Sequence, residues 1–488
     1  LRSYELLLKN ERLLKHYQSR FKHILVDEFQ DTNKLQYAWL KLLADQGACV
    51  MAVGDDDQSI YAFRGANSGN MLSFETDFAI EKVVKLEQNY RSLGNILDGA
   101  NALIKNNDGR LGKNLWTDQG AGEPIRVFRA MTDGEEATFI IEEIQALRNS
   151  GIELKNIALL YRSNAQSRIL EHGLFSSGLP YKVYGGLRFF ERQEVKHALA
   201  YLRLIANSED DGALLRIINF PTRGIGNRTI EHIRDLAERT GTSLWQAACS
   251  APLSGRAVTA VTSFITLIEK LKNEATGFSL PDLIEHSIES SGLIEHYQKD
   301  RDGQDRLENL NELINAASAF ATERADIPSL EAQMANGADE DFNATEIDPL
   351  VDFLAHASLE AGDNQASAGE DALQLMTVHA AKGLEFHSVF ISGLEEGLFP
   401  HENSINEHGG LEEERRLMYV AMTRAMRRLY LSHSQMRMLH GQTRYNIESR
   451  FIDEIPEELL KKINDAKSVA TTATQRTLLP SMTKQKGQ

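Results

Sequence analysis

Two adjacent carboxylates close an apolar run near the start of the sequence. The segment HILVDEF (23–29) contains Asp27 and Glu28 at its polar end. An aspartate in this position can hold a magnesium ion, while the glutamate beside it orients and deprotonates an attacking water. The dipeptide alone is a weak signal, since a solvated strand end carries the same residues. The longer segment VDEFQDTN (26–33) is far more specific.

A second polar segment, VGDDDQSIYAFRGA (53–66), follows another apolar run. Asp55 and Gln58 would lie beside the same metal and phosphates, and an amide side chain there can sense the terminal phosphate. Tyr61 and Phe63 alternate along a short stretch, as stacking platforms for single-stranded bases do, and such stacking contributes ~1–3 kcal/mol per base. Burial of both rings in a core is the alternative.

The elements that must position these residues are predicted from the hydrophobic pattern. Apolar runs at 23–29, 49–55, 156–163 and 388–394, separated by helical stretches such as 137–147, predict buried parallel strands of an α/β sheet. Functional groups in such sheets lie beyond the carboxyl ends of the strands. From about 191 to 360 the pattern is helical, and a polar stretch at 361–370 precedes a new strand. A helical domain therefore interrupts an α/β domain, and we expect a loop without chemistry at 334–348.

Composition excludes several classes of protein. The 488 residues carry 53 Lys and Arg against 70 Asp and Glu, a formal charge of −17, which argues against a surface coated with basic nucleic-acid contacts but not against a local basic groove. Cys49 and Cys249 form no Cys-x-x-Cys spacing, so a thiolate zinc cluster or a disulfide framework is not expected. No apolar run reaches the ~18 residues that cross a bilayer. We expect no membrane partner and a reducing, cytoplasmic location.

Five segments occur in one order along the chain: VDEFQDTN, VGDDDQSIYAFRGA, LEQNYRS (86–92), MTVHAAKGLEFHSVFISGLEEGLFP (376–400) and EEERRLMYVAMTRAMRRLYL (412–431). Together they resemble the conserved motifs of superfamily 1A DNA helicases, the group that includes the Rep and DNA helicase II enzymes. The resemblance extends to about residue 456. It implies an α/β fold of RecA-like parallel-sheet motor domains, one partial and one complete, with an inserted, mostly helical domain.

The implied domain limits follow from these motifs. Residues 1–87 would be the C-terminal part of the first motor domain, 1A. Residues 88–188 and 369–457 would form the second motor domain, 2A, around the inserted domain 2B at 189–368. We expect residues 458–488 to be a disordered basic tail.

The resemblance implies ATP and Mg²⁺ as cofactors. It makes Asp27 the metal ligand and Glu28 the residue that activates water, and it places Asp55 beside the metal. Gln58 and Arg64 would face the γ-phosphate.

The later motifs complete the implied nucleotide site. Tyr90 would stack on adenine and Glu385 would bind the ribose. Arg91 and Arg424 would approach the transferring phosphate from the second motor domain, as an arginine finger does, because planar fixed-charge donors stabilise the transition-state oxygens. For the other arginines of the last motif we expect surface ion pairs.

Implied DNA contacts fall into two groups. In the motor, Tyr61 and Phe63 would stack on bases, and Thr377 and His379 would contact the backbone; family members commonly carry Trp where this chain has Phe63. A structural role is the alternative for His379.

The helical insertion contains the second group, in PTRGIGNRT (221–229). Gly224, Gly226 and Thr229 would contact duplex phosphates through the N-terminus of a helix. A turn that requires flexible glycines explains the same residues.

One expected motif is missing. No Gly-x-x-x-x-Gly-Lys-[Ser/Thr] segment, whose amides and lysine cradle phosphates, occurs in the sequence. The pair Gly112-Lys113 is followed by Asn114, and Asn107 stands where the first glycine would be required. We therefore expect an N-terminally truncated helicase that does not hydrolyse ATP efficiently by itself.

The implied activity of the complete protein is ATP-dependent 3′–5′ translocation on single-stranded DNA, with duplex opening in DNA repair and replication. Its partners would be single-stranded DNA, junctions of single- and double-stranded DNA, repair proteins and a second copy of itself. Two alternatives remain: a non-catalytic DNA-binding fragment, and an accessory paralogue of a helicase-nuclease.

Overall fold

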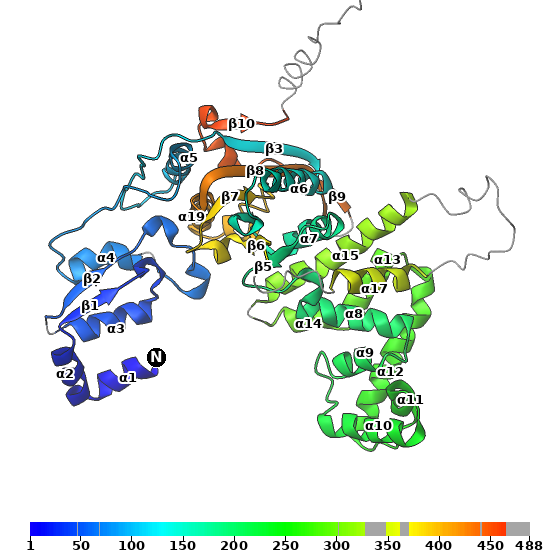
Figure 1. Ribbon diagram of the computed structural model, residues 1–488. Coiled ribbons are helices and arrows are strands. Elements are labelled where there is room, and N and C mark those ends of the chain that lie inside the picture. The colour runs from blue at the N-terminus through cyan, green and yellow to red at the C-terminus, as the bar shows by residue number, and fades with distance from the viewer. Residues whose placement is uncertain are drawn as a thin grey trace, which may run out of the picture. The chain divides into compact units, whose positions relative to one another are not determined.

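The computed structural model describes residues 1–45, 47–67, 69–300, 302–326, 348–361, 370–439 and 442–464. They fall into two compact units (Figure 1), the first within residues 1–162, 373–435 and 446–488 and the second within 163–372 and 436–445. Residues 334–347 of the predicted loop, residues 362–369 of the polar stretch and most of the predicted tail lie outside the described residues. The predicted α/β class is confirmed.

A parallel sheet forms the centre of the first unit. Its strands run in the order β10-β3-β8-β7-β4-β6, and the pairs β10/β3, β8/β7, β7/β4 and β4/β6 are parallel. Leu160 of β4 lies opposite Met376 on one side and Ile391 on the other, and all five residues of β4 are buried. Successive side chains of a strand point to opposite faces, so both faces of β4 are buried, which explains its continuous apolar run. The bounds are β3 Ile125–Thr132, β4 Ile157–Tyr161, β6 Leu373–Thr377, β7 Phe386–Ile391, β8 Ala425–Leu439 and β10 Leu460–Lys462.

Helices cover this sheet. Residues of α5 (Gly94–Ile104) and α19 (Gly410–Met422) join β4, β6 and β7 in one apolar cluster. Helix α6 (Asp133–Asn149) packs on β3, where the rings of Phe128 and Phe139 stack with centroids 3.8 Å apart. The short helices α18 (Glu402–Ile405) and α20 (Arg450–Asp453) complete the later part of the unit.

The N-terminal part carries a separate two-stranded sheet of β1 (His23–Val26) and β2 (Cys49–Ala52), paired in parallel. Ile24 and Val50 pack with Phe29 and Tyr37 on one face. The accompanying helices are α1 (Arg2–Lys9), α2 (Glu11–Arg20), α3 (Lys34–Ala44) and α4 (Gly69–Asp77).

The prediction that β1 and β2 are buried strands is wrong. Leu25 and Met51 are 75% and 58% exposed. Successive side chains of a strand point to opposite faces, and only one face of this small sheet meets apolar residues of the described chain.

The predicted tail also begins too early. Residues 460–462 form strand β10, parallel to Ile125–Val127 at the edge of the main sheet. An edge strand needs backbone partners more than apolar side chains, so the segment LKK gives no hydrophobic signal.

The second unit is mostly helical, as predicted (Figure 1). It begins at Ser163 rather than at residue 189, so it also includes α7 and the short strand β5. The prediction of separate 1A and 2A domains stays a prediction. The elements of the second unit are α7 Ser167–Ser176, β5 Tyr181–Val183, α8 Gln193–Ala206, α9 Asp211–Ile217, α10 Asn227–Thr240, α11 Leu244–Ser250, α12 Arg256–Glu274, α13 Leu280–Ser290, α14 Leu293–Tyr297, α15 Gly303–Asp326, α17 Pro349–Glu360 and β9 Gln442–Tyr445.

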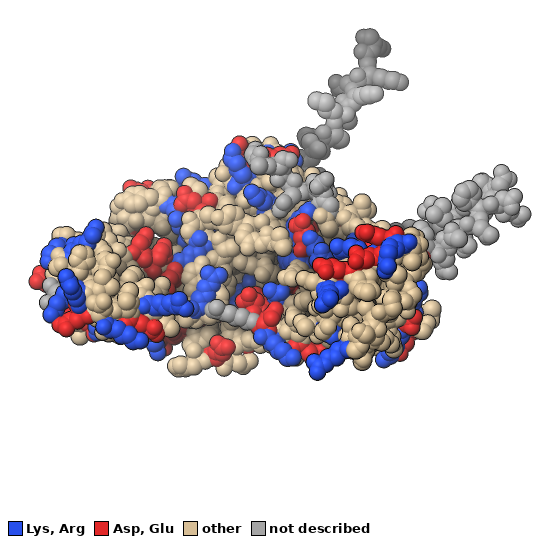
Figure 2. All heavy atoms as spheres, turned by 90° about the horizontal axis from the view of Figure 1, so that it is seen from below, with Lys and Arg blue, Asp and Glu red and all other residues tan. Residues whose placement is uncertain are grey.

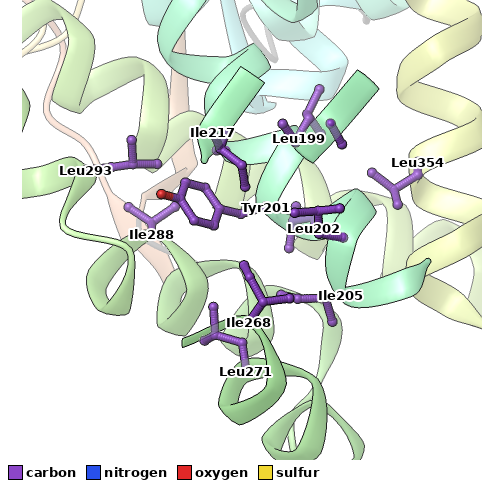
Figure 3. Close-up of a cluster of buried hydrophobic side chains, with 14 of the residues drawn as sticks. Leu199, Tyr201, Leu202, Ile205, Ile217, Ile268, Leu271, Ile288, Leu293 and Leu354 are labelled. Carbon is purple, nitrogen blue, oxygen red and sulfur yellow. The ribbon is translucent and has the colours of Figure 1, made fainter. Parts of the chain in front are cut away.

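Helix α8 lies in the core of this unit. Figure 3 shows Leu199, Tyr201 and Leu202 of this helix among Ile217, Ile268 and other aliphatic side chains. The Tyr201 hydroxyl donates a hydrogen bond to the Phe220 carbonyl at 2.6 Å, which satisfies the one polar atom of that ring.

The surface carries both signs of charge. On the face shown in Figure 2, basic and acidic side chains are intermixed rather than gathered into one basic coat. Within the part of the chain that the structure describes, no helix is both long enough and apolar enough to cross a membrane.

We predict that Leu160→Ala lowers the free energy of unfolding by ~2–5 kcal/mol, because it opens a cavity in a fully buried strand. The matched control is Leu25→Ala in the exposed strand β1, for which we expect a change within ~0.5 kcal/mol. Urea denaturation followed by circular dichroism compares the two variants. Equal losses of stability would contradict the difference in burial between β4 and β1.

Candidate functional site

The loop after β1 presents the two carboxylates singled out from the sequence. Asp27 and Glu28 are both exposed, and an Asp27 carboxylate oxygen accepts a hydrogen bond from the Glu28 amide at 2.9 Å. Glu28 has φ 48°, in the left-handed region. Such a backbone costs ~1–3 kcal/mol in a residue other than glycine, and strain of this kind is concentrated at functional sites.

The ends of β1 and β2 are tied together by Gln30. Its side-chain oxygen accepts a hydrogen bond from the Asp55 amide at 2.9 Å, and its side-chain nitrogen donates to the Glu28 carboxylate. A Cβ atom at Gly54 would lie 2.7 Å from the same Gln30 oxygen, so glycine is required for this close approach. Gln30 therefore connects the first two motifs. Its position inside the first motif does not by itself indicate this contact.

Gln58 links the second motif to the last one. Its Nε2 donates to Asp55 Oδ2 at 2.7 Å, and its Oε1 accepts from Arg424 Nη2 at 3.5 Å. A carboxylate accepts hydrogen bonds and a guanidinium only donates them, so the two partners together define the orientation of the Gln58 amide.

Arg424 is almost completely buried, at 2% exposure. Its other donors contact the carbonyls of Val420 and Leu384, each at 3.1 Å, and the Thr423 hydroxyl at 3.3 Å. Burial, followed by the charge of Arg91, lowers the pKa of Arg424 to about 10. The group therefore stays charged at neutral pH.

Arg91 lies next to Arg424 through their shared contact with Thr423, whose carbonyl accepts from Arg91 Nη1 at 3.5 Å. Arg91 Nε also contacts Glu385 Oε2 at 2.7 Å. Tyr90 is 71% exposed and donates to Gln88. The predicted phosphate, adenine and ribose residues of the second motor domain are thus neighbours.

Two lysines that the sequence did not mark join this group. Lys113 Nζ pairs with the Asp55 carboxylate and lies 3.4 Å from Asp57. Arg110 contacts both oxygens of Asp57 at 2.7 Å. No local pattern could have identified these partners, because Lys113 and Asp55 are 58 positions apart.

Lys382 is the second lysine. Its Nζ lies 2.7 Å from Asp31 Oδ2, 2.9 Å from the Gln58 carbonyl and 3.5 Å from Glu28 Oε2. Arg416, expected to form a surface ion pair, instead donates to the Ser59 carbonyl at 3.0 Å. The fifth and sixth motifs therefore hold the backbone around Gln58 from two directions.

The rings of Tyr61 and Phe63, from the second motif, form an aromatic group with His379. The ring of Phe63 lies 5.9 Å from that of Tyr61 and 5.4 Å from that of His379, and Phe63 is 61% exposed. The Tyr61 hydroxyl donates to the His379 carbonyl at 3.4 Å. Neither Tyr61 nor Phe63 is fully buried, which makes the alternative of two core rings untenable for Phe63.

Arg64 belongs to this aromatic group. Its guanidinium carbon lies 5.2 Å from the Tyr61 ring and 5.3 Å from the Phe63 ring, within the range of a cation–π contact. The same short turn, Ala62–Arg64, carries both Arg64 and Phe63. The position of Arg64 at the γ-phosphate stays a prediction.

His379 and Thr377 come from the turn after β6. The Thr377 hydroxyl accepts from the Ala380 amide at 3.4 Å and so caps this turn. Burial, followed by the charges of Arg162 and Arg64, lowers the pKa of His379 to about 3. A neutral imidazole can form a hydrogen bond with a phosphate but supplies no charge to it.

The glycine loop of the helical unit is shaped by Arg223. Its guanidinium donates to the carbonyls of Pro221 at 3.1 Å and Ser291 at 2.8 Å. Gly224 has φ 81°, and Gly226 is the N-cap of α10. A Cβ at either glycine would meet open space, so the φ value of Gly224, and not crowding, accounts for that residue. The Thr229 amide donates to the Gly226 carbonyl at 2.9 Å.

Of the predicted site residues, the structure brings one connected set together by direct or shared contacts. Its members are Glu28, Asp55, Gln58, Arg91, Arg424 and Glu385. Asp27 adjoins this set, and Tyr61, Phe63, His379 and Arg64 form the neighbouring aromatic group.

Comparison with known proteins adds an independent observation. The UvrD-like helicase C-terminal domain model matches residues 84–436, and the UvrD/REP helicase N-terminal domain model matches residues 1–79. DNA helicase II of Escherichia coli (strain K12) is 49% identical over 469 residues, covering 95% of this chain and 63% of that protein. ATP-dependent DNA helicase PcrA of Bacillus subtilis (strain 168) is 41% identical over 472 residues, covering 95% of this chain and 62% of that protein.

The chain therefore spans somewhat less than two thirds of the length of these relatives. The two domain models follow one another along it in the order of the motifs. This agreement confirms the resemblance to superfamily 1A: the chain belongs to the UvrD/Rep family of helicases.

Proposed function

We propose that this chain is the motor part of an ATP-dependent DNA helicase that moves 3′ to 5′ along single-stranded DNA and opens duplexes in repair and replication. Membership of the family and the names of the relatives, DNA helicase II and ATP-dependent DNA helicase PcrA, support ATP and DNA as ligands. The polarity and the pathways rest on the family resemblance alone. The observation that carries the proposal is the contact between Gln58 and Arg424.

Asp27 and Glu28 fit a magnesium nucleotide in their chemistry. Mg²⁺ is usually bound by one or two carboxylates together with substrate phosphates, and both side chains are exposed. When bound, the ion would neutralise charge on the phosphate oxygens. Asp27 is the proposed ligand, and Glu28 is the proposed acceptor of the proton from the attacking water. Lys382 Nζ lies 3.5 Å from Glu28 Oε2, so a positive charge stands beside this carboxylate.

Arg91 and Arg424 are the proposed contacts to the transferring phosphate. Their charges repel one another across Thr423, and an anion between them would relieve that repulsion. Arg424 also contacts Gln58, which the Lys113–Asp55 pair holds in place. Binding or loss of the phosphate that moves Arg424 would therefore also move the Gln58 side chain.

Gln58 is connected to the proposed DNA contacts by only a few residues of backbone. Ser59 binds Arg416, and the Ala62 amide donates to Glu413 Oε1 at 3.1 Å, both from helix α19. Phe63 follows directly. Movement of α19 together with Arg424 would thus shift the exposed ring on which a base is proposed to stack. This is how the site would couple nucleotide state to DNA position.

We further propose that the 488-residue chain by itself binds DNA but turns over ATP poorly. It contains no phosphate-binding loop, and its Gly112-Lys113 pair serves another purpose, since Lys113 contacts Asp55. A non-catalytic DNA-binding role is therefore the second candidate for this chain in isolation.

The decisive experiment compares the chain alone with the same chain preceded by a segment that contains the Gly-x-x-x-x-Gly-Lys-[Ser/Thr] motif. We expect DNA-stimulated ATP turnover of the chain alone to be at least ~100-fold lower, since even one lost oxyanion donor costs ~10²–10³ in kcat. In the fused protein, Arg424→Lys should lower kcat at least ~100-fold, because lysine lacks the planar fork.

Arg428→Lys is the matched control, because Arg428 of the same motif is partly exposed and pairs with Glu123 at 2.9 Å rather than with the proposed phosphate contacts. It should leave kcat within ~threefold of the unsubstituted fusion. Equal effects of the two substitutions, or full turnover by the chain alone, would contradict the proposal.

We predict that Phe63→Ala weakens binding of a fluorescent oligo(dT) by ~5- to 150-fold, equivalent to the loss of one stacking contact of ~1–3 kcal/mol. Phe278→Ala removes another exposed aromatic ring, 41% exposed in the helical unit, and should leave affinity unchanged. Fluorescence anisotropy measures both. If Phe63→Ala bound as well as the wild-type chain, Phe63 would have no stacking role.

We predict that His379 does not contribute to any pH dependence of DNA binding. With a pKa of about 3, less than ~1% of the imidazole is protonated at about pH 5.5. The ratio of wild-type to His379→Gln affinity should therefore be the same at about pH 5.5 and pH 8. A wild-type gain at the lower pH that His379→Gln lacks would show that the ring becomes charged when DNA is bound.

A further inference from the structure

Three helices of the helical unit place two imidazoles and two carboxylates together, far in sequence from any motif. His172 lies on α7, His356 and Glu360 lie on α17, and Glu323 lies on α15. His172 Nδ1 is 2.6 Å from Glu360 Oε1, and His356 Nε2 is 2.9 Å from the same oxygen. Figure 1 shows these three helices side by side. No part of the proposed helicase mechanism uses this cluster.

Local structure sets the positions of these side chains. His356 and Glu360 are four residues apart on α17 and therefore point from the same face of the helix. His172 reaches the same oxygen from α7, and the His172 and His356 rings meet edge to face with centroids 5.7 Å apart. One donor atom from each of these three residues lies within 4.8 Å of the other two.

This donor set has a definite preference among metals. Imidazole nitrogen suits Zn²⁺, Co²⁺, Ni²⁺ and Cu²⁺, whereas Mg²⁺ and Ca²⁺ prefer oxygen ligands. Two neutral imidazoles with one carboxylate form a three-ligand zinc site of a familiar kind, with water in the fourth position. The Glu360 side chain is only 7% exposed, so its charge needs a positive or hydrogen-bonding partner, both with and without a bound metal ion.

The geometry requires little change to accept an ion. Ligand atoms of a tetrahedral zinc ion at ~2.0–2.1 Å are ~3.3 Å apart, so the two N···O distances of 2.6 and 2.9 Å would have to widen by about 0.7 and 0.4 Å. The His172 and His356 side chains are 26% and 28% exposed and can make this adjustment. Both nitrogens would then present lone pairs in place of protons.

Glu323 provides a second argument. Its Oε1 lies 3.8 Å from His172 Nε2, the ring nitrogen that does not face Glu360. Histidines that bind metals almost always donate their other ring N–H to a carboxylate, carbonyl or water, which orients the ring and raises its basicity. Such an outer carboxylate is unnecessary for a simple contact between His172 and Glu360.

We propose that His172, His356 and Glu360 bind one zinc-class divalent ion, with Glu323 as the positioning residue behind His172. The ion would connect α7 to α17 and so stiffen this part of the helical unit. Binding must displace the protons that the two imidazoles now share with Glu360, so affinity falls as pH falls.

The test uses the full 488-residue chain, stripped of metal and freed of any histidine tag. Zinc is titrated against a chromogenic chelator, and Co²⁺ is added separately to observe its visible ligand-field absorption. We expect one tight equivalent in the wild-type chain. His172→Gln and His356→Gln should each remove that equivalent, and Glu323→Gln should weaken it by ~10- to 100-fold.

His286→Gln is the matched control. His286 pairs with Glu274 at 2.8 Å in the same unit but has no second imidazole in that contact, and its replacement should leave the tight equivalent intact. Circular dichroism verifies that each variant is folded. Should one variant unfold, the wild-type Co²⁺ spectrum still decides, because tetrahedral nitrogen ligation gives strong visible absorption and octahedral hydration does not.

Several outcomes would overturn the proposal. These are the absence of a tight zinc equivalent in the wild-type chain, an equal equivalent in folded His172→Gln and His356→Gln, and a Co²⁺ spectrum of the hydrated ion. Loss of the equivalent in His286→Gln would move the site elsewhere and overturn it as well.

Discussion

The buried guanidinium of Arg424 is the constraint on which the candidate site depends. A charge removed from water must have all its donors satisfied, and here they require the carbonyls of Val420 and Leu384, the Thr423 hydroxyl and the Gln58 amide oxygen. Each partner belongs to a different part of the chain or to the end of helix α19. The need to satisfy one cation therefore fixes the relative positions of three motifs.

The acidic residues of the second motif impose the complementary constraint. Asp57 is 1% exposed and is held by both nitrogens of the Arg110 fork. Desolvation raises the pKa of Asp57, and the Arg110 contact opposes that shift. Asp55 is held by Lys113 and in turn holds Gln58. Salt bridges of this kind specify one arrangement more than they add stability.

Sequence reasoning identified the catalytic motifs because each is a local pattern with a chemical requirement. It predicted that Glu28, Gln58, Arg91 and Arg424 would converge, and the contacts join them. It missed the contact of Lys113, whose partner Asp55 lies far away in the sequence. It also gave no indication that Arg64 would contact the rings of Tyr61 and Phe63. The exposure of β1 could not be predicted from the sequence either, because an apolar strand is buried only where another layer of the structure covers it.

That open strand has a consequence for the behaviour of the polypeptide. A two-stranded sheet is marginally stable by itself, and one face of β1 and β2 leaves Leu25, Met51 and Val53 in water. Amide hydrogens in these strands should exchange with solvent faster than those of β4, which is enclosed on both sides. In a cell, this lobe is where chaperones and proteases would engage the 488-residue polypeptide first.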